Sequence, residues 1–106
     1  MALNITRTVI QMVSEANEQV EEISVANALR LIKHENILFI DVRDIREVAK
    51  TGRLPGARHV PRGMLEMWID PETPYHRDFF AEDRKFIFYC ASAWRSALAA
   101  KTAQDM

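Results

Sequence analysis

The sequence contains a single cysteine, and its surroundings favour a reactive thiol. Cys90 follows the apolar segment 85–89 (KFIFY), and Arg95 stands five positions after it. If residues 91–95 curl around the sulfur, their backbone N–H groups, the dipole of a following helix and the Arg95 guanidinium all favour negative charge there and lower the thiol pKa. The thiolate would be a nucleophile, and the same loop would bind an anionic substrate. The alternative from spacing alone is a buried structural cysteine.

Two strand-like segments place this loop at one edge of a sheet. Residues 37–40 (ILFI) form a continuous apolar run before Asp41, and residues 85–89 carry aromatic and β-branched side chains before Cys90. Helix-forming segments alternate with them, which predicts an α/β fold with an open parallel sheet flanked by helices. Ligands bind at the carboxyl ends of the strands in such sheets, and Cys90 stands at one of these ends.

The other predicted elements are helices and turns around these strands. Apolar residues over 5–20 recur at three- and four-residue intervals, which predicts an amphipathic helix, and Ser24 is expected to cap a second helix. A capping box at Asp44 and Glu47 begins a short helix that Gly52 ends. The remaining predictions are a turn at 54–57, a short strand at 58–60, one or two helical turns at 63–69 and a helix at 96–103.

Composition bounds the class of protein. The 106 residues, of which 48% are hydrophobic and 27% charged, fit one globular domain, and the formal net charge of −1 lacks the basic character of a nucleic-acid-binding domain. The longest apolar run is about five residues, far below the roughly 18 of a transmembrane helix, and the N-terminus does not resemble a secretory signal. One unpaired cysteine fits a reducing cytosol. We therefore predict a cytoplasmic protein with no membrane and no nucleic-acid partner.

Three stretches, in the right order, resemble the rhodanese-like sulfurtransferases. Residues 39–43 (FIDVR), followed by Glu47, resemble the family's D-V-R-x-x-x-E signature. Residues 52–61 (GRLPGARHVP) resemble its G-H-I-P-G-A turn, with Arg53 where histidine is usual. Residues 88–97 (FYCASAWRSA) resemble its cysteine loop. Each motif is weak alone, but their order and spacing are specific to this family.

The resemblance covers about residues 23–106. It implies an N-terminal amphipathic helical extension at 1–20 and a rhodanese-like domain at 21–106, with residues 20–23 as the first strand. A full domain of this family has five parallel strands, and the sequence supplies segments for four. We therefore expect the domain to lack the family's last strand and helix at its C-terminus. The sheet would then be completed by further chain, by a homodimer or by strand exchange. The last two would form through this edge or through the N-terminal helix.

The resemblance implies a sulfurtransferase that works through a persulfide on Cys90. The Cys90 thiolate would attack a small anionic sulfur donor, thiosulfate or a persulfide, and pass the sulfur to a thiol acceptor or to cyanide. Cys90 is then the catalytic residue, and no metal or organic cofactor is implied. The substrate-binding residues would be those of the loop: Ala91, Ser92, Ala93, Trp94 and Arg95. Three residues of the first signature would serve as polar scaffold or as the edge of the site: Asp41, Arg43 and Glu47.

Two positions of the loop depart from the family pattern, which often reads C-R-x-G-x-R. Ala91 has no positive charge, which suits a less charged donor such as a protein or low-molecular-weight persulfide. Ala93 replaces glycine, and a positive φ would strain an alanine. Both departures favour the first alternative, a non-catalytic rhodanese-like binding or regulatory module. The second alternative is a cysteine-dependent phosphatase or arsenate reductase, but the related phosphatases have one more residue between their cysteine and arginine.

The histidines and the remaining charged residues do not predict a second functional site of a defined kind. The spacing of the three histidines, at positions 34, 59 and 76, does not match that of a metal site, and no second cysteine could complete one. Residues 43–62 are rich in cations: Arg43, Arg46, Lys50, Arg53, Arg58 and Arg62. This stretch is either a solvated face or a docking surface for an acidic donor or acceptor protein.

Overall fold

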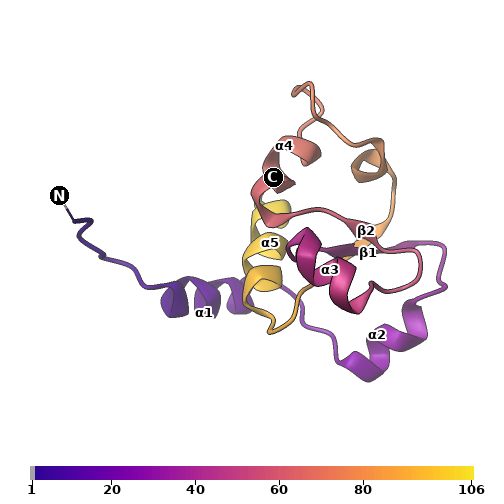
Figure 1. The fold of residues 1–106 in the computed structure, drawn as a ribbon, viewed down its shortest axis with the longest axis horizontal. Coiled ribbons are helices and arrows are strands. Elements are labelled where there is room, and N and C mark those ends of the chain that lie inside the picture. The colour runs from indigo at the N-terminus through magenta and orange to yellow at the C-terminus, as the bar shows by residue number, and fades with distance from the viewer. Residues whose placement is uncertain (1) are drawn as a thin grey trace.

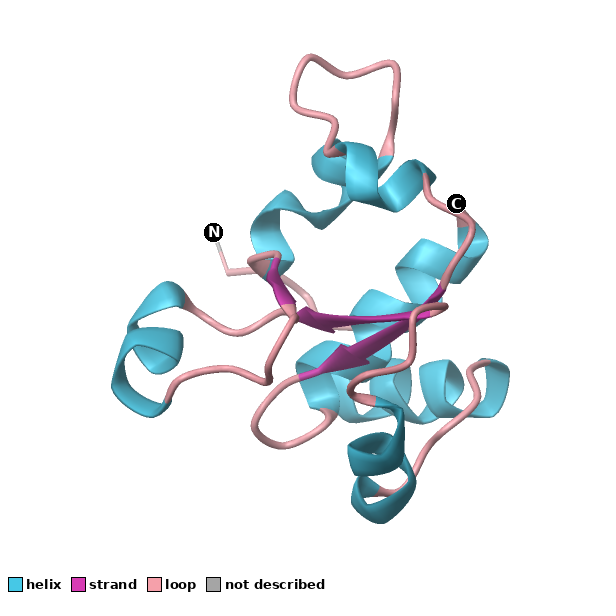
Figure 2. Ribbon diagram, turned by 90° about the vertical axis from the view of Figure 1, so that its right-hand side faces the viewer, coloured by secondary structure: helices cyan, strands magenta, loops and turns pink. Residues whose placement is uncertain are grey.

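A three-stranded parallel sheet forms the centre of the computed structural model, which describes residues 2–106 (Figures 1 and 2). β1 (Ile37–Asp41) lies between β2 (Arg58–His59) and β3 (Lys85–Tyr89), and both neighbours run parallel to it. The two longer strands, β1 and β3, pair along their whole length, so Asp41 lies beside Tyr89 at their carboxyl ends. The predicted α/β class and open parallel sheet are confirmed.

Helices connect and flank the strands. They are α1 (Val9–Gln19), α2 (Val25–Leu31), α3 (Ile45–Thr51), α4 (Leu65–Ile69) and α5 (Trp94–Asp105), with short 3-10 helices η1 (Arg62–Met64) and η2 (Asp78–Ala81). Ser24 caps α2 by accepting the Asn27 N–H at 3.2 Å. The predicted capping box of Asp44 and Glu47 begins α3, which ends at Gly52 with φ 75°. No helix among residues 2–106 has the length and apolarity to cross a membrane.

The sheet is covered on both faces, as its continuous apolar strands require. Leu38 and Ile40 of β1 face one side and pack with Leu65 of α4 and Ala99 of α5. Phe39 points to the other side, where partly buried residues of α2 pack against its cluster. The alternation along β1 therefore builds two separate cores around one strand.

The N-terminal helix lies against the last helix (Figure 1). Val13 and Ala16 of α1 are buried against Ala97 of α5. The helix is shorter than predicted, because Thr8 caps its first turn and residues 2–7 are not helical. Part of the apolar face of α1 therefore packs against the rest of the chain. The domain boundary predicted at residue 20 stays a prediction.

The prediction of a strand at residues 20–23 is wrong, since this segment pairs with no strand. β3 forms a ladder with β1, and among the described residues no strand lies along its other edge. Residues 20–23 and β3 line one open groove beside this free edge and form no ladder across it. This groove of about 580 Å³ is also lined in part by the exposed side chains of Val25 and Leu29. Completion of the edge by further chain or by a second copy stays a prediction.

Candidate active site

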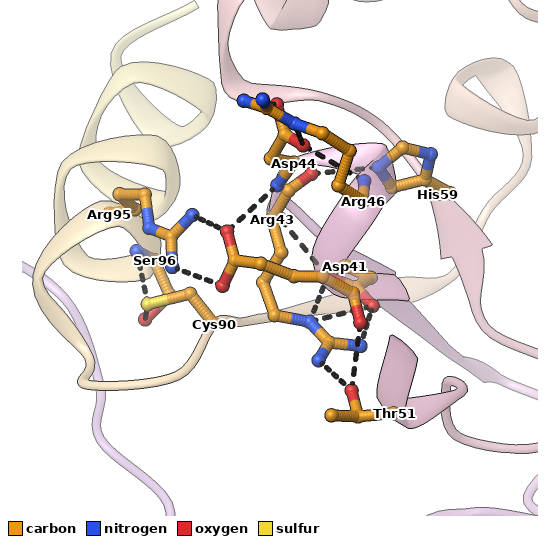
Figure 3. Close-up of polar contacts among 10 residues, drawn as sticks. Asp41, Arg43, Asp44, Arg46, Thr51, His59, Cys90, Arg95 and Ser96 are labelled. Carbon is orange, nitrogen blue, oxygen red and sulfur yellow. Dashed lines mark hydrogen bonds and ion pairs between the residues drawn. The ribbon is translucent and has the colours of Figure 1, made fainter. Parts of the chain in front are cut away.

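Cys90 directly follows the carboxyl end of β3, and three residues separate it from the start of α5 (Figure 3). The helix begins at Trp94, two residues before the predicted start, so its first turn lies beside the sulfur. The backbone N–H of Ser96 donates to Cys90 Sγ at 3.3 Å, and the Ser96 hydroxyl oxygen lies 3.5 Å from the same atom. The loop therefore turns hydrogen-bond donors towards the thiol.

These donors favour the charged form of the cysteine. Burial raises the pKa of the Cys90 thiol, but hydrogen bonds from the Ser96 hydroxyl and N–H and from the N–H groups of Ser92 and Ala93 outweigh it. The net result is a pKa below the ordinary value of a thiol, and the thiolate is the reactive form. Sequence reasoning missed Ser96. The available signal was a hydroxyl residue one position after Arg95, in the first turn of the helix.

Replacement of Ser96 by alanine tests this arrangement. Ser96→Ala loses the hydroxyl donor but keeps the backbone N–H, so we expect the pKa of Cys90 to rise. The measurement is the rate of iodoacetamide alkylation against pH, whose midpoint in the wild type should lie below that of a free cysteine thiol. Ser92→Ala is the matched control, because Ser92 acts through its backbone. Equal midpoints for Ser96→Ala and the wild type would contradict the assignment.

The loop is closed by a strained alanine. Ala93 has φ 68° and ψ −1°, and it is the one non-glycine residue with positive φ among those described. Its Cβ makes this left-handed conformation unfavourable, whereas glycine adopts it freely. The sequence comparison with the family's glycine thus identified the right position. Ala93 directs its N–H towards the sulfur at a cost in backbone strain.

Ala93→Gly is expected to stabilise the protein by about 1 kcal/mol, because relief of the strain exceeds the entropy that glycine adds to the unfolded chain. Urea denaturation at pH 7 measures this change. Ala91→Gly is the control in the same loop, where φ is not positive, and it should destabilise slightly. A loss of stability in Ala93→Gly equal to that in Ala91→Gly would show that the alanine is not strained.

Arg95 is held by a carboxylate. Its Nη1 and Nη2 donate to the two carboxylate oxygens of Glu47 at 2.6 and 3.0 Å. Glu47 is fixed in turn by the N–H of Asp44, which donates to its Oε1 at 3.2 Å. The bond to Arg95 lowers the pKa of Glu47, and the same bond, with a smaller contribution from Cys90, raises the pKa of Arg95. Glu47 therefore orients Arg95 and offsets part of its positive charge at the loop.

Asp41 and Arg43 form a second cluster that supports the first. Asp41 is fully buried and accepts from Arg43 Nε at 2.9 Å, Nη2 at 2.7 Å and the backbone N–H at 3.0 Å (Figure 3). Arg43 also donates to the Thr51 hydroxyl at 2.8 Å and to the Gly52 carbonyl at 2.7 Å. These bonds tie the end of β1 to the end of α3, which carries Glu47.

The structure thus divides the predicted site residues into two groups. Ser92 and Ala93 direct their N–H groups to the sulfur of Cys90, whereas the Trp94 side chain is 48% exposed. Asp41 and Arg43 lie behind them and reach the loop through α3 and the Glu47–Arg95 pair. The first group can stabilise a thiolate and bind an anion, and the second holds the helix that positions Arg95.

An open parallel sheet with a cysteine loop at the carboxyl end of a strand places the chain among the α/β proteins that carry a cysteine at this edge of the sheet. The family model of the Rhodanese-like domain matches residues 24–106, and the chain belongs to this family. It is also similar to a solved structure from Rhodopseudomonas palustris CGA009, described as a protein of unknown function and possible tyrosine phosphatase. The two are 49% identical with a TM-score of 0.95, over 100% of this chain and 82% of the other. No match was found among curated proteins.

Proposed function

We propose that this protein is a sulfurtransferase that carries sulfur as a persulfide on Cys90. The observation that supports the proposal best is the Ser96 N–H that donates to Cys90 Sγ, with the lowered pKa of this thiol, in a loop of the rhodanese-like family. The proposed substrates are thiosulfate or a persulfide as donor and a thiol or cyanide as acceptor. The loop donors would bind the anionic donor and stabilise charge on the sulfur.

The proposed reaction consists of two displacements. The Cys90 thiolate attacks the sulfane sulfur of thiosulfate, a new S–S bond forms, and the old S–S bond breaks with its electron pair leaving on sulfite. A thiolate or cyanide then attacks the outer sulfur of the Cys90 persulfide, and the Cys90 thiolate leaves. Each step transfers an electron pair within the reacting atoms, so no external oxidant or reductant is consumed. A lowered pKa of Cys90 supports both steps, because the thiolate is the nucleophile in one and the leaving group in the other.

Phosphate-ester hydrolysis is the second candidate, because the similar solved structure is described as a possible tyrosine phosphatase. Such an enzyme would need Arg95 to bind the phosphate oxygens beside the thiolate. Here both terminal nitrogens of Arg95 donate to Glu47, and four residues separate Cys90 from Arg95. These two features favour sulfur over phosphate.

Parallel assays separate the candidates. Thiocyanate formation from cyanide is measured with thiosulfate and with glutathione persulfide as donors, and hydrolysis of p-nitrophenyl phosphate is measured on the same protein. We expect thiocyanate and no phosphate release. We also expect the neutral Ala91 to favour the persulfide donor, so a much lower KM for thiosulfate would refute that preference. Phosphate release without thiocyanate would establish the phosphatase, and neither product from the folded protein would indicate a binding module.

A further inference from the structure

A second hollow lies away from the cysteine loop and is lined by cationic side chains. It is an open groove of about 650 Å³. Leu38 of β1, His59 of β2 and Arg84 just before β3 line it, whereas neither Cys90 nor residues 91–95 do. Four arginines from separate parts of the chain face it: Arg53, Arg58, Arg77 and Arg84.

Most of this positive charge is uncompensated. Arg84 Nε pairs with Glu82 at 2.8 Å, but the side chains of Arg53, Arg58 and Arg77 make no ion pair within residues 2–106. No aspartate or glutamate lines the groove. Other arginines of the predicted basic stretch differ in this respect, since Arg43 is paired with a buried aspartate. Like charges around one hollow repel each other and attract an anion.

Aromatic rings hold two of the guanidinium groups in place. Arg77 Cζ lies 4.2 Å from the centroid of the Trp68 ring, and Arg58 Cζ lies 5.3 Å from that of Phe79. A guanidinium over a ring keeps its N–H groups free at its edge. Trp68 and Phe79 themselves pack against the buried core. Arg58 and Arg77 are therefore ordered before a ligand arrives, which reduces the entropy lost on binding.

We propose that this groove binds a small anion that carries two charged phosphate groups. A guanidinium group can donate two parallel hydrogen bonds to two oxygens of one phosphate. Such charge-assisted hydrogen bonds are stronger than those between neutral groups. Arg53 and Arg58 come from one stretch of the chain and Arg77 from another, so a ligand with two oxyanion groups contacts more of them than a single phosphate does. The volume falls within the range of small-molecule sites. The site is separate from the sulfur chemistry at Cys90.

Isothermal titration of the full chain with pyrophosphate at low ionic strength tests the proposal. We expect one site per chain, and binding about tenfold weaker or more in Arg58→Gln and in Arg77→Gln, because each loses charge-assisted hydrogen bonds. Arg30→Gln is the matched control. Arg30 is an exposed residue of α2 that bonds Asn27 at 3.2 Å, and its replacement changes the net charge equally without touching the groove. Its binding of pyrophosphate should equal that of the wild type.

Several results would overturn the proposal. They are the absence of pyrophosphate binding, an equal loss in Arg30→Gln, and tighter binding of a polyglutamate peptide than of pyrophosphate, which would indicate an acidic protein partner. Arg53→Gln is a second groove variant that removes no aromatic contact, in case Arg77→Gln lowers the Tm. Sulfur transfer at Cys90 should be unchanged in all variants, so failure here is distinguishable from failure of the proposed function.

Discussion

Cys90→Ser is expected to abolish thiocyanate formation, with turnover at least about a thousandfold below that of the wild type. The serine hydroxyl remains protonated near neutral pH, and its oxygen forms no persulfide. The donors from Ser96 that favour a thiolate do not bring a hydroxyl into the same range of pKa. The measurement is the rate of thiocyanate formation at saturating thiosulfate and cyanide.

The chain is well suited to this test because Cys90 is its single cysteine. No second thiol can accept sulfur in its place, so residual transfer reports the background reaction. Serine is close to cysteine in size, and Cys90 is partly exposed, so the variant should keep the Tm of the wild type within a few degrees. A folded Cys90→Ser protein with more than about a tenth of the wild-type rate would contradict the persulfide mechanism.

Asp41→Asn is expected to lower the free energy of unfolding by about 3 kcal/mol, because it leaves the buried guanidinium of Arg43 without its counter-charge. Asp41 is 0% exposed, and the Arg43 side chain is 12% exposed. Urea denaturation at pH 7 measures the loss. Asp44→Asn is the control, since asparagine also caps helices and the Arg46 partner of Asp44 is 90% exposed. Similar losses of unfolding free energy in both variants would show that the buried Asp41–Arg43 pair stabilises the fold no more than the exposed Asp44–Arg46 pair does.

The same pair predicts the direction of a pH dependence. Burial raises the pKa of Asp41, but its bonds to Arg43 bring it below the ordinary value. The ionised carboxylate therefore stabilises the fold above the pKa of the unfolded chain, about 3.9, and this contribution is lost as the pH falls through the lower folded pKa. Stability should fall below about pH 4 in the wild type, and this part of the fall should be absent from Asp41→Asn.

Local signals predicted most of the elements. The apolar run 37–40 and the aromatic segment 85–89 have few alternatives to buried strands, and Asp44, Glu47 and Gly52 give the bounds of α3 directly. The prediction failed at residues 20–23 because a strand must pair with a neighbour, and these residues lie across an open groove from the free edge of β3. Sheet pairing is a property of the fold, and a short segment does not encode it alone.

The candidate site was predictable in part. The position of Cys90 and the exceptional backbone at Ala93 follow from the loop sequence and its resemblance to the family. The Glu47–Arg95 pair joins residues 48 positions apart and depends on where the fold places α3 and α5, so no local pattern reports it. The groove of arginines is likewise assembled from distant segments. The sequence shows Arg53 and Arg58 in one basic stretch but not their meeting with Arg77.

The most direct test of the persulfide on Cys90 is the intact mass of the wild-type protein after incubation with thiosulfate or glutathione persulfide, before and after addition of cyanide. We expect a gain of one sulfur atom per chain, and its complete loss when cyanide is added and thiocyanate appears. Folded protein that gains no sulfur from either donor, or that keeps the added mass in the presence of cyanide, would contradict the proposed sulfurtransferase.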